Sequence, residues 1–187
     1  MPVVLYDACV LYSAQLRDLF MRLTLADLCL ARWTDEILNE WSRATSEKHP
    51  HVSVESVARC RTLMNEHAPD ALVTGYESLV PTLSLPDPND CHVLAAAIHA
   101  QARVIVTFNL KDFPEEVLSF HGIEAVHPDE FLFRLIQNNL ASVCAVVKSQ
   151  RVVLKKPPID ADAFLNRLER QGLPQTAAIL RTVSGLL

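Results

Sequence analysis

Short apolar runs alternate along the chain with segments whose apolar residues recur at helical spacing. The runs that fit buried strands are residues 2–6, 71–76, 103–107 and 123–126. The segments that fit helices are residues 17–31, 34–48, 53–67, 88–101 and 129–136. Strands that alternate with helices predict an α/β fold, with an open and mostly parallel sheet of four or five strands between two layers of helices.

The pattern changes after residue 137. Residues 151–159 (RVVLKKPPI) are a basic stretch interrupted by prolines, and residues 160–184 fit two helices separated by Gly172 and Pro174. We therefore predict two parts, a domain over residues 1–137 and a helical C-terminal extension over residues 138–187.

Composition limits the setting in which the protein works. Half of the residues are hydrophobic, but no apolar run reaches the roughly 18 residues that a membrane span needs. The N-terminus has no basic segment before its apolar run and reaches Asp7 early, which argues against a signal peptide. The five cysteines are an odd number without a C-x-x-C pair, which argues against a disulfide framework and a structural zinc site. We expect a cytoplasmic protein without membrane association.

The net charge of −5 is unevenly distributed. Residues 1–143 hold 10 Lys and Arg against 19 Asp and Glu, whereas residues 144–187 hold 7 against 3. An acidic body is unusual for a passive nucleic-acid binder. It is compatible with an enzyme whose acidic site holds a cation while basic groups elsewhere meet phosphates.

The stretch LPDPNDCHVLAAAI, residues 85–98, places two acids at the start of an apolar helix. Asp87 fits an N-cap with Pro88 at the first helical position. Asp90 fits two roles equally well from this stretch alone: an acid in the first turn that favours the helix dipole, or a metal ligand.

Four acids lie at or beside the predicted carboxyl ends of strands, where ligands bind in open α/β sheets. They are Asp7, Glu40, Asp90 and Asp112. Converging carboxylates without basic partners raise one another's pKa, and a divalent cation removes that penalty. Each has an ordinary alternative: Asp7 ends a strand, Glu40 is solvated on its helix, Asp90 caps, and Asp112 forms a turn.

The order of these motifs resembles the PIN-domain ribonucleases, and is most similar to the VapC-type toxins of bacterial toxin–antitoxin pairs. The stretches that carry the resemblance are the strand ending in Asp7, E-I-L-N-E-W around Glu40, D-P-N-D before an A-A-A helix, and V-I-V-T-F-N-L-K-D-F, within residues 2–135. Residues 138–187 lie outside it. Two positions depart from the family pattern: Cys9 stands where the family often has Asn, and Asn109 stands where many members have Asp.

The resemblance implies a PIN-like α/β/α fold and a divalent-metal-dependent endoribonuclease. Asp7, Glu40, Asp90 and Asp112 would be the catalytic acids, with Asp7, Asp90 and Asp112 holding Mg²⁺ or Mn²⁺. Thr107 and Asn109 would support the site or contact the substrate, and Asn109 is an alternative to Asp112 as the fourth site residue. The implied partners are an RNA substrate, a small antitoxin protein and a second copy of the chain.

Three other functions compete with this interpretation. The same fold with a weak metal site would be an RNA- or protein-binding module, and Cys9 and Asn109 favour it. Asp7 as a phosphotransfer nucleophile would need a second acid nearby, which ACVLYS does not supply. Catalysis by Cys9 or Cys91 would need a histidine base, and His92 is adjacent to Cys91 in sequence and therefore points elsewhere on a helix. For the basic C-terminal extension, RNA binding, dimer contact, partner docking and a solvated appendage all remain open.

Overall fold

A four-stranded parallel sheet forms the centre of the protein in a computed structural model that describes residues 1–155 and 157–187. The strands are β1 (Val3–Tyr6), β2 (Leu30–Arg32), β3 (Val104–Val106) and β4 (Glu124–Val126). Their spatial order is β2-β1-β3-β4, and every neighbouring pair is parallel. The predicted α/β class and parallel sheet are therefore confirmed.

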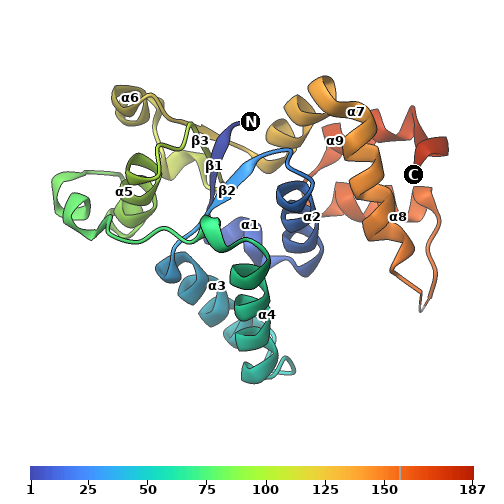
Figure 1. Cartoon of the computed structure of the whole chain (residues 1–187), viewed down its shortest axis with the longest axis horizontal. Helices are drawn as coiled ribbons and strands as arrows, with labels where there is room; N and C mark the ends of the chain where they lie inside the picture. Colours follow the sequence, from blue (N-terminus) through green and yellow to red (C-terminus); the bar gives the residue numbers. More distant parts are fainter. Residues whose placement is uncertain (156) are drawn as a thin grey trace.

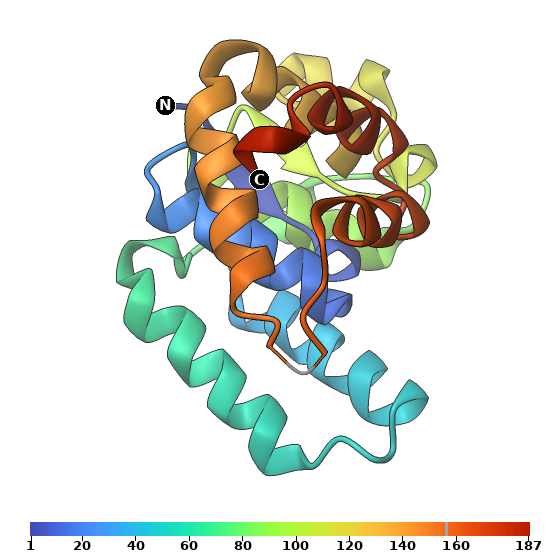
Figure 2. The same ribbon diagram turned by 90° about the vertical axis from the view of Figure 1, so that its right-hand side faces the viewer.

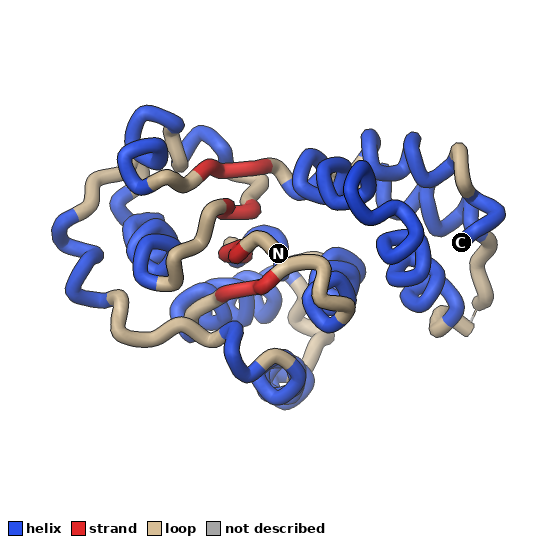
Figure 3. Tube along the Cα trace, turned by 45° about the horizontal axis from the view of Figure 1, so that its top comes forward, coloured by secondary structure: helices blue, strands red, loops and turns tan. Residues whose placement is uncertain are grey.

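Helices cover both faces of this sheet (Figure 1). They are α1 (Ala8–Tyr12), α2 (Ala14–Leu25), α3 (Asp35–Lys48), α4 (Val54–His67), α5 (Cys91–His99), α6 (Glu115–Leu118) and α7 (Pro128–Val152). Helix α5 packs on β1 and β3 from one side, whereas α2 and the start of α7 lie on the other. Figure 3 shows the strands side by side between these layers. Residues 91–97 of α5 are all buried, as its apolar sequence predicts.

Two of the predicted helices begin where their polar residues indicate. The Thr34 side chain accepts a hydrogen bond from the Ile37 N–H at the start of α3. The Ser53 side chain accepts one from the Ser56 N–H at the start of α4. Both are N-caps that satisfy an otherwise unpaired amide.

Two predictions about local structure were wrong. The segment 17–31 is not one helix, because α2 ends at Leu25 and Asp27 takes a left-handed backbone with φ of 54°. The chain then continues into β2, a strand of three residues whose apolar positions also fit the helical spacing of the preceding segment. The segment 71–76 is not a strand: Leu72 makes only an isolated parallel bridge to Trp33, and Gly75 has a φ of 83°, outside the range of a strand.

The C-terminal region is helical, as predicted. It continues from α7 into α8 (Ala161–Arg170) and α9 (Pro174–Arg181), with Gly172 in a left-handed turn between them. Figure 2 shows α7 as a long helix in front of α2 with α8 and α9 beside it. Helix α7 crosses the predicted boundary at residue 137 and is interrupted by non-helical angles at Asn139. Lys156, in the predicted linker, lies outside the described residues.

A buried carboxylate joins the start of α7 to the start of α9. Asp129 accepts hydrogen bonds from the backbone N–H groups of Gln175, at 2.9 Å, and Thr176, at 2.8 Å. Leu173, at the N-cap position of α9, has no side chain that can cap the helix. Asp129 therefore caps α9 from a distant part of the sequence.

No helix within the described residues is both long enough and apolar enough to cross a membrane.

Candidate active site

Asp7 and Thr107 meet at the carboxyl edge of the sheet, because β1 and β3 are neighbours in register. Tyr6 pairs with Val106, so the next residue of each strand lies beside the other. The Thr107 hydroxyl donates a 2.6 Å hydrogen bond to Asp7 Oδ2. Both side chains are buried, with 5% and 0% of their surface exposed. This contact fixes the orientation of the Asp7 carboxylate.

Cys9 supplies the polar contact that the family pattern assigns to Asn. Its Sγ donates to Asp7 Oδ2 over 3.0 Å and accepts from the backbone N–H of Phe108 over 3.3 Å. Burial, and then the negative charge of Asp7, raise the pKa of Cys9 to about 12. A protonated thiol is a donor and a poor nucleophile, which argues against catalysis by Cys9.

Asp87 and Asp90 have different roles at the start of α5. The Asp87 carboxylate accepts a 2.9 Å hydrogen bond from the Asn89 N–H, so Asp87 is the cap. Asp90 makes no capping hydrogen bond. Burial, followed by the charges of Asp7, Asp87, Asp112 and Glu40, raises the pKa of Asp90 to about 6.

Glu40, on α3, pairs with His92, which was not among the predicted site residues. His92 Nε2 lies 3.0 Å from Glu40 Oε1, and its Nδ1 lies 3.6 Å from Glu36. Burial lowers the pKa of His92, but the hydrogen bond and charge of Glu40 outweigh it and leave the pKa above its usual value. The feature of the sequence that points to His92 is its position two residues after Asp90 on a buried helix.

Asp112 and Asn109 lie in the loop after β3. Asp112 ends a short 3-10 turn, Leu110–Asp112, and is half-buried, and its charge contributes to the raised pKa of Asp90. Asn109 is exposed, and its backbone N–H donates to the Thr107 hydroxyl at 3.0 Å. The structure thus brings Asp112 into the electrostatic reach of the other acids, whereas Asn109 supports Thr107 through its backbone.

These four carboxylates are here called the acidic site: Asp7, Glu40, Asp90 and Asp112. Within residues 1–155 and 157–187, neither Lys nor Arg forms an ion pair with any of them. The same residues contain no group of three or more His, Cys, Asp or Glu placed to enclose one metal ion. The donor set nevertheless fits Mg²⁺, because that ion prefers carboxylate oxygens, keeps several waters and needs only one or two direct carboxylates.

The C-terminal region touches the loop that carries Thr107. A Cβ on Gly172 would lie 3.1 Å from a ring carbon of Phe108, so the turn between α8 and α9 sits directly on that side chain. Phe108 also contacts His127 edge-on, with ring centroids 4.9 Å apart. The residue that follows Thr107 is therefore held between two parts of the chain.

Comparisons with known proteins agree with this architecture. The family model described as PIN domain matches residues 3–111, and the model described as VapC50 C-terminal domain matches residues 128–182. A protein of Mycobacterium tuberculosis (strain ATCC 25618 / H37Rv), named "Putative ribonuclease VapC50", is 37% identical over 118 residues, which cover 61% of this chain and 69% of that protein. No solved structure gave a significant match.

The PIN-domain match covers more than half of the chain, including the strand that ends in Asp7 and the loop with Thr107. The second match shows that the C-terminal helices, which the sequence motifs left outside the resemblance, also have a counterpart in a described family. The chain belongs to the PIN-domain family, as a VapC-type member.

Proposed function

We propose that this protein is a divalent-metal-dependent endoribonuclease that hydrolyses RNA phosphodiester bonds and acts as the toxin of a toxin–antitoxin pair. The observation that carries the proposal is the gathering of acids around Asp90, where burial, and then the charges of Asp7, Asp87, Asp112 and Glu40, raise its pKa to about 6. Raised pKa values caused by converging charges are typical of functional sites. The ribonuclease name of the mycobacterial relative supports the choice of RNA.

Asp7, Asp90 and Asp112 are the residues that would hold Mg²⁺ or Mn²⁺. When bound, the ion neutralises their charge, activates a water and stabilises charge on the phosphate. Glu40 is the fourth acid, and it would position the attacking water. The 3.0 Å contact between His92 Nε2 and Glu40 Oε1 orients this carboxylate and supports that role.

The surrounding residues of the chain hold the carboxylates in place before substrate binds. Thr107 and Cys9 both donate to Oδ2 of Asp7, and the Asn109 backbone in turn donates to Thr107. A carboxylate held by two donors costs little reorganisation when a cation approaches. Thr107, Cys9 and the backbone of Asn109 are therefore positioning groups in this proposal.

The proposed setting follows from this activity. A toxin that cleaves cellular RNA works in the cytoplasm, its antitoxin would be a small protein that blocks the acidic site, and a homodimer is the expected assembly. In this proposal, residues 1–137 form the nuclease domain and residues 138–187 form its helical extension.

Incubation of purified protein with a labelled RNA pool, in Mg²⁺ or Mn²⁺ and in EDTA, tests the proposal. Wild-type protein should cleave RNA only with the metal, and Asp90→Asn should not cleave. Absence of cleavage by folded protein free of antitoxin, under every metal, would favour the RNA- or protein-binding module instead. Cleavage by Asp90→Asn would show that Asp90 is not part of the catalytic site.

A further inference from the structure

A cavity of about 560 Å³ is formed by α1, α2, α3 and the start of α4. Its volume is in the range of small-molecule sites. We call it the aromatic pocket, after the aromatic and polar side chains among its lining: Tyr12, Arg17, Trp41, Thr45, His49 and His51. Gln171, at the end of α8, also reaches it.

Helix α1 leads from Asp7 of the acidic site to Tyr12 in the lining of the aromatic pocket. Helix α1 begins directly after Asp7 and ends at Tyr12, which places the two about 7.5 Å apart along the helix axis. On α3, Trp41 follows Glu40 and Thr45 comes four residues later, and His49 follows the end of the helix as its C-cap. Residues four apart share a helix face, so Trp41 and Thr45 line one stripe of α3, whereas Glu40, the neighbour of Trp41, lies on a different face. The link between the pocket and the acidic site is therefore through α1.

The charge of the pocket lining differs from that of the rest of this acidic chain. Its lining, all within the described residues, includes Arg17 but neither Asp nor Glu. Lys48 adds a second cation, with its Nζ 5.1 Å from the centre of the Tyr12 ring. The first turn of α4, at Ser56 and Val57, also lines the cavity, and Glu55 in the same turn offsets the partial positive charge of that helix start. An anionic ligand complements such a wall.

Aromatic surface accompanies this positive charge. Tyr12 stacks on His49 with ring centroids 5.6 Å apart, and the Tyr12 hydroxyl lies 2.8 Å from His49 Nε2. The Arg17 guanidinium lies 4.5 Å from the centre of the Trp41 ring. Flat rings beside a guanidinium are the surfaces on which unpaired bases stack.

Two polar atoms in the pocket wall have no partner among the described residues. They are Trp41 Nε1 and Thr45 Oγ1, and their residues are only 1% and 8% exposed. A buried N–H or hydroxyl without a partner is costly, and native sites that keep one commonly complete it with a ligand or water. Both atoms can donate, and a ligand in the cavity reaches them only when neighbouring side chains move, because neither atom is exposed.

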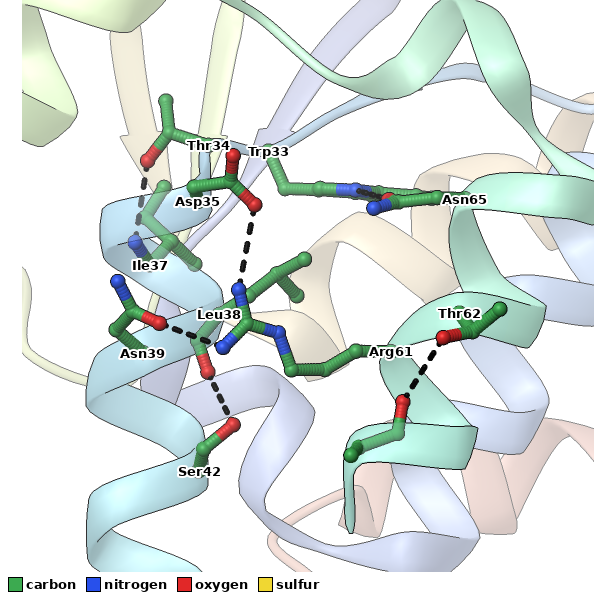
Figure 4. A network of polar contacts seen from close by, with 11 residues as sticks. Trp33, Thr34, Asp35, Ile37, Leu38, Asn39, Ser42, Arg61, Thr62 and Asn65 are labelled. Atoms are coloured by element: carbon green, nitrogen blue, oxygen red, sulfur yellow. Dashed lines mark hydrogen bonds and ion pairs between the residues drawn. The ribbon is translucent and has the colours of Figure 1, made fainter. Parts of the chain in front are cut away.

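Polar contacts hold α4 against α3, two of the helices that form the pocket. Arg61 of α4 binds Asn39 at 2.5 Å and Asp35 at 3.2 Å on α3, and the Trp33 indole donates to Asn65 at 2.9 Å (Figure 4). These contacts join the second half of α4 to the beginning of α3, and they limit how far the two helices can move apart.

We propose that the aromatic pocket binds a nucleotide of the RNA strand next to the scissile phosphate, with Arg17 on the phosphate and Tyr12, His49 and His51 against the base. This proposal rests on the proposed ribonuclease function and adds a subsite to it. The acidic site repels a polyanion until it holds a cation, so the affinity for the strand comes from the adjacent positive wall.

Fluorescence anisotropy with a labelled single-stranded oligoribonucleotide in EDTA tests this binding without cleavage. His51→Ala removes an exposed ring and should lower affinity about fivefold or more. Arg17→Ala should lower affinity at least tenfold, and the slope of log affinity against log salt should fall by about 0.7. Tyr12→Leu should weaken binding, whereas Tyr12→Phe, which keeps the ring, should not. Melting temperatures establish that each variant is folded.

Arg59→Ala is the matched control. Arg59 is an exposed arginine of α4 outside the pocket lining, so the same loss of charge there should leave affinity and salt slope unchanged. If Arg59→Ala and Arg17→Ala lose the same RNA affinity, the effect comes from overall charge and the proposal is overturned. Unchanged RNA affinity in the Arg17, Tyr12 and His51 variants, or no RNA binding by wild-type protein, would overturn it too and leave the pocket to a protein partner. Metal-dependent cleavage is measured separately, so failure of the nuclease proposal and failure of the subsite are distinguishable.

Discussion

Asp90 and Asp129 are both aspartates near the start of a helix, but the chain surrounds them in opposite ways. Asp129 receives two backbone N–H donors from α9 and is buried. Asp90 caps nothing, and burial and four other acids raise its pKa to about 6. The first carboxylate stabilises the fold, whereas the second is held in place at a cost in stability. This difference separates a structural acid from one that is available for a cation.

The largest expected effect is on catalysis at Asp7. Asp7→Asn removes a metal-ligating charge while its amide oxygen can still accept from Thr107, so RNA cleavage should fall by roughly 100-fold or more. Initial rates with labelled RNA in Mg²⁺ measure this. Glu116→Gln, the same kind of change on exposed residue 116 of α6, is the control and should cleave like the wild type.

The next effect is on stability at the junction of α7 and α9. Asp129→Ala leaves the Gln175 and Thr176 N–H groups without their acceptor, and should lower the free energy of unfolding by about 2 kcal/mol. Urea unfolding measures it. If Asp129→Ala unfolds at the same urea concentration as the wild type, Asp129 is not the cap of α9.

Asp90 should show the opposite sign of stability change. Its folded pKa lies above its usual 3.8, so the folded state binds the proton more tightly and ionisation destabilises it as pH rises through about 6. Asp90→Asn should therefore raise the melting temperature of metal-free protein at pH 7.5, on the order of 2–4 °C, and the difference should fade below pH 4. Scanning calorimetry in EDTA measures this. A lower melting temperature at pH 7.5 would mean that Asp90 is a structural acid like Asp129.

The smallest effect is expected at Cys9. Cys9→Asn keeps a donor toward Asp7 Oδ2, so cleavage should stay within about threefold of the wild type. Cys9→Val removes the donor without changing the charge and should slow cleavage more than Cys9→Asn does. Equal rates for the two variants would show that the thiol does not position Asp7.

The sequence predicted what depends on local pattern. Strands β1, β3 and β4, the caps at Thr34, Ser53 and Asp87, and the helices of the C-terminal region all lie where their residues indicated. Strand β2 escaped detection because it has three residues and follows a helix of the same apolar composition.

What the sequence did not show depends on contacts between distant segments. The stretch around Asp90 fitted a cap and a ligand equally, and only the approach of Asp7 and Asp112 separates the two environments. The pairing of Glu40 with His92 joins residues 52 positions apart. The aromatic pocket needs the end of α8 beside α1 and α3, which no local periodicity encodes.

Binding of Mn²⁺, followed by electron paramagnetic resonance, tests most directly whether the acidic site is a metal site. Wild-type protein should bind Mn²⁺ and reduce the signal of the free ion, and Asp90→Asn and Asp7→Asn should each weaken that binding strongly while Glu116→Gln should not. Mn²⁺ binding that is the same in all four proteins, or absent in the wild type, would contradict the account.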